Sequence, residues 1–355
     1  MKAAMLSKFG ESLRIEEIPD PKPGPGDVVV QVLAVPVLGY MKDVLSGKRN
    51  YPLLLPLAPG TGAIGKVLAV GPDATRLKVG QLVYCDPTVR SRDDSIAPDI
   101  MLQGLIAPGE GAQRLQTHFR NGAFAQQMLL PLENASALDG LEGFDPAQLS
   151  WMSTFLVPYG GLLAAGLQAG ETVLISGATG HFGGAAVAVA LAMGAARVIA
   201  PGRNQEALDE LRRRFGARVT TVQLTGNERE DRQLMQRAAG SAIDKVLDIL
   251  PPINNAAPVR AAALAVRAYG TVVLMGGVDA NLDLPYSEIM RNSITLRGQF
   301  MYPRSAPRQL SALIRAGLLS LQDLETKTFA LHEINAAVEH AAATYAPWQK
   351  TVIAL

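Results

Sequence analysis

Val173-Leu-Ile-Ser-Gly177-Ala-Thr-Gly180-His-Phe-Gly183 decides the fold class of this chain, because it leads an apolar strand into a glycine loop. The alanine-rich segment that follows is typical of a helix. Gly177 permits a tight exit from the strand, Gly180 lets N–H groups approach a pyrophosphate, and Gly183 lets the helix pack close. Glycines also mark ordinary turns, but the flanking strand and helix favour a ligand site. The stretch predicts a dinucleotide site formed by Gly177, Ala178, Thr179, Gly180, His181, Phe182 and Gly183.

The second half of the chain alternates strand-like and helix-like segments. Six apolar runs are predicted to be strands, at residues 172–176, 197–200, 219–224, 243–250, 271–276 and 294–300. Amphipathic or alanine-rich stretches fill most of the gaps between them. Because parallel strands need crossover helices, this order predicts an α/β fold with a doubly wound, parallel, six-stranded sheet in residues 151–301.

The first part of the chain carries short β-type runs separated by glycine and proline. The predicted strands are residues 27–33, 63–70, 81–84 and 123–130. After residue 300, a helix (307–316), a strand (328–331), a helix (333–345) and a strand (351–355) are expected to return to this region. We therefore expect a β-rich domain made of residues 1–150 and 302–355. The polar stretch 86–121 is expected to be a folded lobe or a flank of the active site.

Composition and charge exclude several classes of function. The net charge of the chain is +1 and its basic residues are dispersed, so no nucleic-acid partner is expected. No apolar stretch suits a membrane span or a secretory signal, which favours a cytoplasmic location. Cys85 is the single cysteine, and the four histidines form no cluster of zinc-site spacing. The sequence therefore predicts no disulfide and no metal site.

Four N-terminal motifs occur in an order typical of one family. They are Pro19-Asp-Pro-Lys-Pro-Gly-Pro-Gly-Asp27, Ala58-Pro-Gly-Thr-Gly-Ala-Ile-Gly-Lys-Val67, Val79-Gly-Gln-Leu-Val83 and Gly122-Ala-Phe-Ala125. With the glycine loop, they make essentially the whole chain resemble the medium-chain dehydrogenase/reductase superfamily. The resemblance implies a GroES-like catalytic domain, a Rossmann domain and a substrate cleft between them.

The chain departs from this superfamily at the catalytic metal. In zinc alcohol dehydrogenases of the superfamily, cysteine and histidine ligands stand where this chain has Tyr40, Thr61 and Ser153. None of these three is a good zinc ligand. Residues 86–121, where relatives often carry a four-cysteine structural zinc, contain no cysteine. The chain is thus most similar to zinc-free members such as quinone oxidoreductases and enoyl or alkenal reductases.

The end of the second predicted strand bears on the choice of cofactor. NAD-specific folds usually place a carboxylate there to accept hydrogen bonds from the ribose hydroxyls. Gly202 occupies that position, and the guanidinium of Arg203 can bind a 2′-phosphate. We therefore expect NADP(H), with Gly202, Arg203 and Asn204 at its adenosine end. Alternatively, Arg203 is an exposed turn residue and Asn204 caps the following helix.

Without zinc, another group must stabilise the charge that remains after hydride transfer. A conjugated acceptor spreads this charge into an enolate or quinol that hydrogen-bond donors can hold. Tyr40 is one candidate donor, and Tyr51 is another because Asn50-Tyr-Pro-Leu resembles the Tyr-Pro segment of related enoyl reductases. Thr61 and Ser153 are further candidates. Each hydroxyl could instead belong to a wall residue satisfied elsewhere.

The resemblance implies further contacts at the carboxyl edge of the sheet. Pro158 and Tyr159 are expected beneath the nicotinamide ring, and His181 along the pyrophosphate. Members of the superfamily commonly dimerise through the sixth Rossmann strand, so the segment from Ile294 to Phe300 is expected to form a homodimer, although it could be a covered edge. Backbone groups expected to hold the nicotinamide and its ribose are those of Ile249, Leu250, Gly276, Gly277 and Val278.

Three functions remain open from the sequence. The leading one is zinc-independent, NADPH-dependent reduction of an α,β-unsaturated carbonyl or a quinone. The second is a metal-free alcohol dehydrogenase or ketone-aldehyde reductase on the same scaffold. The third is a non-enzymatic NADPH-binding protein, such as a redox sensor or a structural protein.

Overall fold

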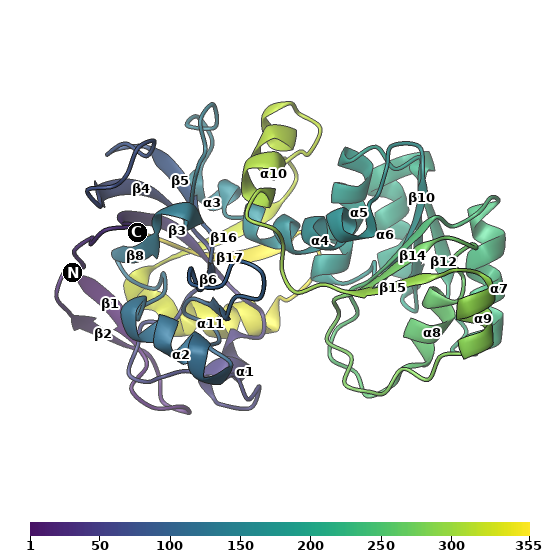
Figure 1. Ribbon diagram of the computed structural model, residues 1–355, viewed down its shortest axis with the longest axis horizontal. Helices are drawn as coiled ribbons and strands as arrows, with labels where there is room; N and C mark the ends of the chain where they lie inside the picture. The colour runs from purple at the N-terminus through teal and green to yellow at the C-terminus, as the bar shows by residue number, and fades with distance from the viewer.

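The computed structural model describes residues 1–355 as two units side by side (Figure 1). The β-rich unit contains both chain termini, and the α/β unit is built from the middle of the chain. Helix α4 (Met152–Ala165) lies at the junction of the two units.

A seven-stranded sheet is the centre of the β-rich unit. Its order is β16-β17-β3-β4-β5-β9, and β8 also pairs with β3. These strands are β3 (Asp27–Val37), β4 (Ala63–Val70), β5 (Leu82–Cys85), β8 (Gln127–Pro131), β9 (Ala135–Ala137), β16 (Glu325–Ala330) and β17 (Gln349–Ala354). Strand β17 runs antiparallel to β3, with Ile353 opposite Val35. The prediction that the end of the chain returns to the first part is therefore confirmed.

Short elements surround this sheet. Strands β1 (Lys2–Met5) and β2 (Arg14–Glu17) form an antiparallel pair. The covering helices and helical turns are α1 (Met41–Leu45), η1 (Leu132–Asn134), α3 (Pro146–Leu149), α10 (Ala306–Arg315), η3 (Leu331–Glu333) and α11 (Ile334–Ala343).

The stretch 86–121 forms a small lobe of its own. It contains β6 (Thr88–Arg90), β7 (Ile100–Leu102) and α2 (Gly109–His118). Val89, Met101 and Phe119 are among the buried residues of a separate apolar cluster in this lobe. Of the two expectations for this stretch, a folded lobe is therefore confirmed.

The α/β unit contains the predicted doubly wound sheet. All neighbouring strands in it are parallel, in the order β12-β11-β10-β13-β14-β15. The strands are β10 (Thr172–Ser176), β11 (Arg197–Gly202), β12 (Val219–Gln223), β13 (Lys245–Asp248), β14 (Thr271–Leu274) and β15 (Thr295–Gly298). This order reverses direction at β10, the arrangement that creates a ligand crevice at the carboxyl edge. The predicted fold class is confirmed.

Helices cover both faces of the α/β sheet. Val173 and Ile175 of β10 pack into the core shared with α4, α5 and α6, whereas Leu174 packs into the core shared with α7 and α8. Because alternate strand residues point to opposite faces, a strand buried on both sides reads as a continuous apolar run. The helices and the helical turn of this unit are α5 (His181–Ala192), α6 (Gln205–Phe215), η2 (Gly216–Arg218), α7 (Glu228–Ala239), α8 (Ala257–Ala263) and α9 (Tyr286–Arg291). No helix of the chain has the length and apolar character needed to cross a bilayer.

Several predicted strand boundaries differ from the structure by two residues or more, among them the starts of the strands predicted at 123–130 and 243–250. The strand predicted at 123–130 begins at Gln127, because the N–H groups of Ala123 and Phe124 bond to the carbonyls of Gly60 and Pro59 instead of a strand. The strand predicted at 243–250 begins only at Lys245, after Asp244 has turned its carboxylate to the N–H of Thr172, at 2.8 Å.

Candidate functional site

The glycine loop joins β10 to α5 at the carboxyl edge of the sheet. Gly177 has a φ of +87°, and a Cβ there would lie 3.0 Å from the carbonyl oxygen of Ile249. A Cβ on Gly183 would overlap the carbonyl oxygen of Gly177, so α5 can approach the strand end only with glycine at 183. Gly180 is the N-cap of α5 and has no side chain to occupy the first N–H groups of the helix. Those N–H groups are available to an anionic ligand, as the sequence predicts.

The side chains of the other loop residues are largely turned into the protein. Ala178 is buried under the loop and Thr179 is half-buried, while Phe182 packs in the first turn of α5 against the main core. A pyrophosphate held at this helix end would therefore contact backbone atoms more than side chains.

The end of β11 lacks an acidic side chain and has little room for one. A Cβ on Gly202 would lie 2.7 Å from Thr179 Cγ2 and 2.9 Å from Leu208 Cδ2. Arg203 is exposed, and its guanidinium has no hydrogen-bond or ion-pair partner. Asn204 Oδ1 accepts a hydrogen bond from the N–H of Ala207 at 3.1 Å, so this side chain caps α6. Asn204 is thus a structural N-cap, whereas Arg203 remains free to bind a phosphate.

The ends of β13 and β14 meet beside the glycine loop. The N–H of Ile249 bonds to the carbonyl of Ser176 at 3.0 Å, and the N–H of Gly277 bonds to the carbonyl of Leu250 at 2.8 Å. A Cβ on Gly276 would lie 2.9 Å from Leu250 N, so glycine lets these two segments approach each other. A cavity of 150 Å³ lies here, and Gly276 and Val278 are among its lining residues. The structure therefore brings the predicted nicotinamide-binding segments to one edge.

Asp248 is a buried carboxyl at this edge that the sequence reasoning missed. It ends β13, is 3% exposed and lines the same cavity. Burial raises the pKa of Asp248 to about 6, and its Oδ1 atom has no hydrogen-bond partner. The available signal was a charged residue closing the apolar run of a central strand, where desolvation is costly.

Helix α4 crosses the ends of the same two strands. A Cβ on Gly161 would touch Leu247 of β13 and the sulfur of Met275, which follows β14. Pro158 lies within this helix, one turn earlier, and is buried. Tyr159, however, donates its hydroxyl to Gln309 Oε1 of α10 at 3.3 Å, so that side chain faces α10.

Ser153 lies against Gly62, the residue after Thr61, at the junction of the two units. A Cβ on Gly62, next to Thr61, would lie 3.3 Å from Ser153 Cβ. The Oγ1 atom of Thr61 is buried and has no hydrogen-bond partner. Ser153 Oγ, in contrast, donates to the carbonyl of Ser150 at 2.8 Å. The hydroxyl of Thr61 is therefore buried and unpaired, while the hydroxyl hydrogen of Ser153 is already engaged.

Lys350 stands beside Ser153, and the sequence reasoning did not single it out. Its buried Nζ lies 2.8 Å from the carbonyl oxygen of Ser150, 2.9 Å from Ser153 Oγ and 2.9 Å from Thr154 Oγ1. An ammonium has three N–H donors and no lone pair, so these three acceptors satisfy it completely. Burial lowers the pKa of Lys350 well below its ordinary value, while the three acceptors favour the protonated form.

His181 continues this network away from the expected pyrophosphate position. Its Nδ1 atom lies 3.1 Å from the carbonyl oxygen of Ala346, and its Nε2 atom lies 3.2 Å from Thr154 Oγ1. Because a carbonyl can only accept, Nδ1 carries the proton and Nε2 accepts from the threonine. Burial, aided by the nearby Lys350, lowers the pKa of His181 to about 4, so the ring is neutral at pH 7. The ring is held by the C-terminal segment, which the local sequence around the loop could not reveal.

Tyr40 and Tyr51 share one cationic neighbour. The Arg49 guanidinium carbon lies 3.9 Å from the ring centre of Tyr40 and 5.2 Å from that of Tyr51. Burial is the main reason that the pKa of the Tyr40 hydroxyl lies above its usual value. Tyr345 also packs here, because a Cβ on Gly39 would overlap its ring. The structure therefore brings the two predicted donors together and adds Tyr345 to them.

A second buried hydrogen-bond chain ends next to Gly62. Asp86 Oδ1 accepts from the Tyr302 hydroxyl at 2.9 Å, and the hydroxyls of Tyr302 and Tyr84 are 3.2 Å apart. Since Tyr302 donates to the carboxylate, Tyr84 must donate to Tyr302. The Tyr84 hydroxyl also lies 3.3 Å from the position of a Cβ on Gly62. This chain ties the β-rich unit to the segment that leaves β15.

The residues at this junction do not make the donor set of a zinc site. No group of three or more His, Cys, Asp or Glu side chains in the chain is arranged to hold a metal ion. The positions that the resemblance assigns to zinc ligands carry the hydroxyls of Tyr40, Thr61 and Ser153. Lys350 is hydrogen-bonded to Ser153. Zinc sites in proteins use Cys, His and carboxylate ligands.

Comparison with known proteins agrees with the fold. Residues 24–139 match the alcohol dehydrogenase GroES-like domain, and residues 182–316 match the zinc-binding dehydrogenase family. An alcohol dehydrogenase of Rhizobium meliloti (strain 1021) is 29% identical over 309 residues, covering 86% of this chain and 85% of the relative. An NAD-dependent alcohol dehydrogenase of Sulfurisphaera tokodaii is 25% identical and covers 96% of both chains.

Solved structures share the whole fold. A chain from Sinorhizobium meliloti 1021 that was solved bound to NADP superposes with a TM-score of 0.79 at 20% identity, covering 100% of this chain and 99% of that one. Two family models match consecutive parts of the chain, and the fold contains the Rossmann sheet and the GroES-like unit that these families share. Together these findings establish the family of the chain. The chain belongs to the medium-chain dehydrogenase/reductase superfamily and is an alcohol dehydrogenase-like oxidoreductase.

Proposed function

We propose that this oxidoreductase is zinc-independent and uses NADPH to reduce the activated C=C bond of an α,β-unsaturated carbonyl compound or a quinone. The observation that carries the proposal is the pairing of Lys350 with Ser153 at 2.9 Å. The Nζ group of Lys350 directs its N–H groups at Ser150, Ser153 and Thr154, so it is not oriented as a metal ligand there, and its protonated form would oppose a divalent metal ion.

The residues of the α/β unit fit a dinucleotide. The open N–H groups at the start of α5 would hold the pyrophosphate, and the free guanidinium of Arg203 would bind a 2′-phosphate. The crowding around Gly202 disfavours the carboxylate typical of NAD-specific folds. The Sinorhizobium meliloti chain of the same fold was solved bound to NADP, which agrees with this preference.

The hydroxyls at the junction would complete the reaction. NADPH, when bound, supplies the hydride to the β-carbon of the substrate. Thr61, whose buried hydroxyl lacks a partner, would donate to the oxygen of the resulting enolate. Tyr40 or Tyr51 would deliver a proton to the α-carbon, and the phenolate left behind would take a proton back from water. Burial raises the pKa of Tyr40 and so makes it a weaker acid than an exposed phenol. The enolate is thereby converted to the saturated carbonyl compound.

A second candidate is a metal-free alcohol dehydrogenase or ketone reductase. It is favoured by the relatives, which are named alcohol dehydrogenases. In that case the hydride would add to the carbonyl carbon, and the same hydroxyls would protonate an alkoxide.

The position of a deuterium label separates these functions. The protein is given NADPH deuterated at the transferred position and a panel of enones, quinones and simple ketones. A saturated ketone with deuterium on the β-carbon supports the proposal, whereas an allylic alcohol with deuterium on the carbinol carbon supports the second candidate. NADPH binding without turnover of any compound would favour the third possibility, a sensor or structural protein.

We further propose that the protein forms a homodimer through β15. This strand is the edge of the six-stranded sheet, and all four of its residues are exposed. Large apolar side chains are also exposed next to it, with Phe300 at 56% and Met290 at 55%. An unpaired apolar edge readily pairs with a second copy. Light scattering after size exclusion should give twice the 37.6 kDa chain mass, and a Leu296→Asp variant should be monomeric. A monomeric native protein would contradict the proposal.

A further inference from the structure

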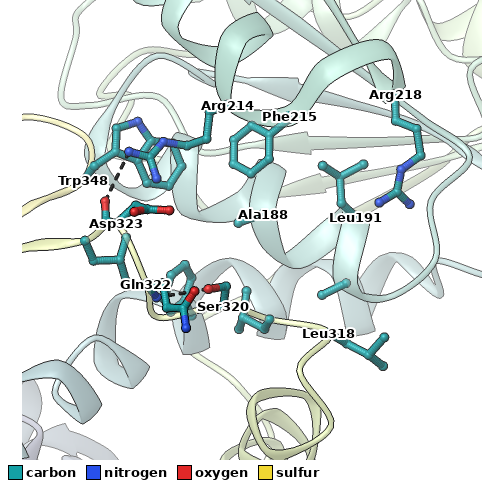
Figure 2. Close-up of a pocket in the computed structure, with 14 residues that line it drawn as sticks. Ala188, Leu191, Arg214, Phe215, Arg218, Leu318, Ser320, Gln322, Asp323 and Trp348 are labelled. Carbon is teal, nitrogen blue, oxygen red and sulfur yellow. Dashed lines mark hydrogen bonds between the residues drawn. The ribbon is translucent and has the colours of Figure 1, made fainter. Parts of the chain in front are cut away.

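A cavity of 320 Å³ lies outside the candidate active site (Figure 2). Its walls come from α5, from α6 and the turn after it, and from the segment 318–324 that leads back to the β-rich unit. This volume falls at the lower end of the range of small-molecule sites, about 300–1,000 Å³.

The cavity is distinct from the cofactor edge. Helices α5 and α6 both begin at the carboxyl ends of their strands, where a dinucleotide binds. The cavity is lined by Leu191 and Phe215, which lie in the last turns of these helices. It therefore opens at the other end of the helices and does not depend on the proposed function.

The floor of the cavity is apolar. Ala188 and Leu191 of α5 form one side, and Phe215 packs against Trp348 with ring centres 5.5 Å apart. Trp348 comes from the segment before β17 and touches α5, because a Cβ on Gly184 would lie 2.8 Å from its ring. Both units of the protein thus contribute to one apolar surface.

Two guanidinium groups border this surface. Arg214 stacks on the Trp348 ring at 4.5 Å, and its Nε atom has no hydrogen-bond partner, since Glu210 is 3.8 Å away. Arg218 is exposed and takes part in no hydrogen bond or ion pair. In Figure 2, Arg218 lies beside Leu191, away from Trp348 and Asp323, the only carboxylate that lines the cavity.

We propose that this cavity binds a small carboxylic acid with an apolar body. The hydrocarbon part would lie on Ala188, Leu191 and Phe215, where it displaces water from apolar surface. The carboxylate would pair with the free guanidinium of Arg218, whose planar N–H groups match two carboxylate oxygens. Asp323 stays at the opposite end and so does not oppose the carboxylate at close range.

The test measures binding of octanoate by calorimetry and by tryptophan fluorescence. The chain has two tryptophans, and Trp348 lines the cavity. We expect saturable binding of one octanoate per chain, with at least tenfold weaker binding of 1-octanol. Arg218→Gln should raise the octanoate Kd about tenfold, and Ala188→Phe should abolish binding by filling the cavity.

The control is Arg213→Gln, which removes an exposed arginine of α6 that does not line the cavity. It should leave the octanoate Kd unchanged, and all three variants should bind NADPH like the native protein. Absence of saturable octanoate binding, or equal octanoate affinity of the native protein and Arg218→Gln, would overturn the proposal.

Discussion

The Nζ atom of Lys350 lies 2.9 Å from the Oγ atom of Ser153, although the two residues are 197 positions apart in the chain. Lys350 is the second residue of the C-terminal strand of the β-rich unit, and Ser153 is the second residue of the helix at the junction of the units. The same ammonium reaches Thr154, which in turn bonds to His181 of the nucleotide loop. The buried amino group of Lys350 thus joins three segments beside Ser153, a position that the sequence resemblance assigns to a zinc ligand.

Replacing Arg203 tests the cofactor preference. Arg203→Ala should lower kcat/KM for NADPH about 10- to 100-fold, because a charge-assisted hydrogen bond contributes about 1.5–3 kcal/mol, and should leave the value for NADH unchanged. Gly202→Asp is a poor test, since even a Cβ at 202 would crowd Thr179. Arg213→Ala, on the exposed face of α6, serves as the control. A native protein that already prefers NADH would show the cofactor assignment to be wrong.

Thr61 offers a variant in which stability and activity should move in opposite directions. Thr61→Val removes a buried hydroxyl that has no partner, so the free energy of unfolding should rise by about 1 kcal/mol. The same change should lower kcat at least tenfold, because the donor to the enolate oxygen is lost. Thr61→Ser keeps the hydroxyl and should retain activity. Unchanged kcat in Thr61→Val would remove Thr61 from the mechanism.

The two junction tyrosines can be separated by their phenylalanine variants. If Tyr40 is the proton donor, Tyr40→Phe should lower kcat about 100-fold or more while Tyr51→Phe stays near the native rate, since general acids contribute about 10²–10⁴-fold. The aromatic ring that Tyr40→Phe retains would still pack under Arg49, so folding should persist. The exposed Tyr286 gives a control variant, Tyr286→Phe. Native rates in both junction variants would rule out a phenol as the acid.

The low pKa of His181 should make the free energy of unfolding decrease at acidic pH. Its pKa is about 4 in the folded protein against an ordinary value of 6.5, so between these values the unfolded chain binds more protons. Stability conferred by neutral His181 is therefore lost as pH falls from about 6.5 to about 4, by about 3 kcal/mol. Asp248, with its raised pKa, produces the opposite trend over a similar range.

The comparison with His181→Gln isolates this contribution, because Asp248 is common to both proteins. The native free energy of unfolding minus that of His181→Gln should shrink by about 3 kcal/mol between pH 7 and pH 4. A difference that stays constant over this range, in urea titrations at each pH, would contradict a half-buried His181 that is neutral in the folded protein.

The α/β unit could be predicted closely because its strands are buried on both faces. The strand Thr172–Ser176 has the bounds expected from its continuous apolar run. The boundary at Ala123 was missed because its N–H bonds to Gly60, a contact without local periodicity. Among the site residues, the glycine loop has a strong local signature and Asp248 a weak one, a charge that closes an apolar strand, whereas Lys350 has none. Lysine and aspartate residues usually lie at solvent-exposed positions. Only the tertiary fold shows that Lys350 and Asp248 are buried.

Metal content and its effect on turnover test the central claim most directly. The purified protein is analysed for zinc, treated with a strong chelator, and assayed for NADPH-dependent reduction of an enone before and after zinc is added back. We predict substoichiometric zinc and equal rates in all three samples, because Lys350 holds Ser153 in a hydrogen bond and the nearby donors are hydroxyls. One tightly bound zinc per chain, with activity that is lost on chelation and restored by zinc, would contradict it.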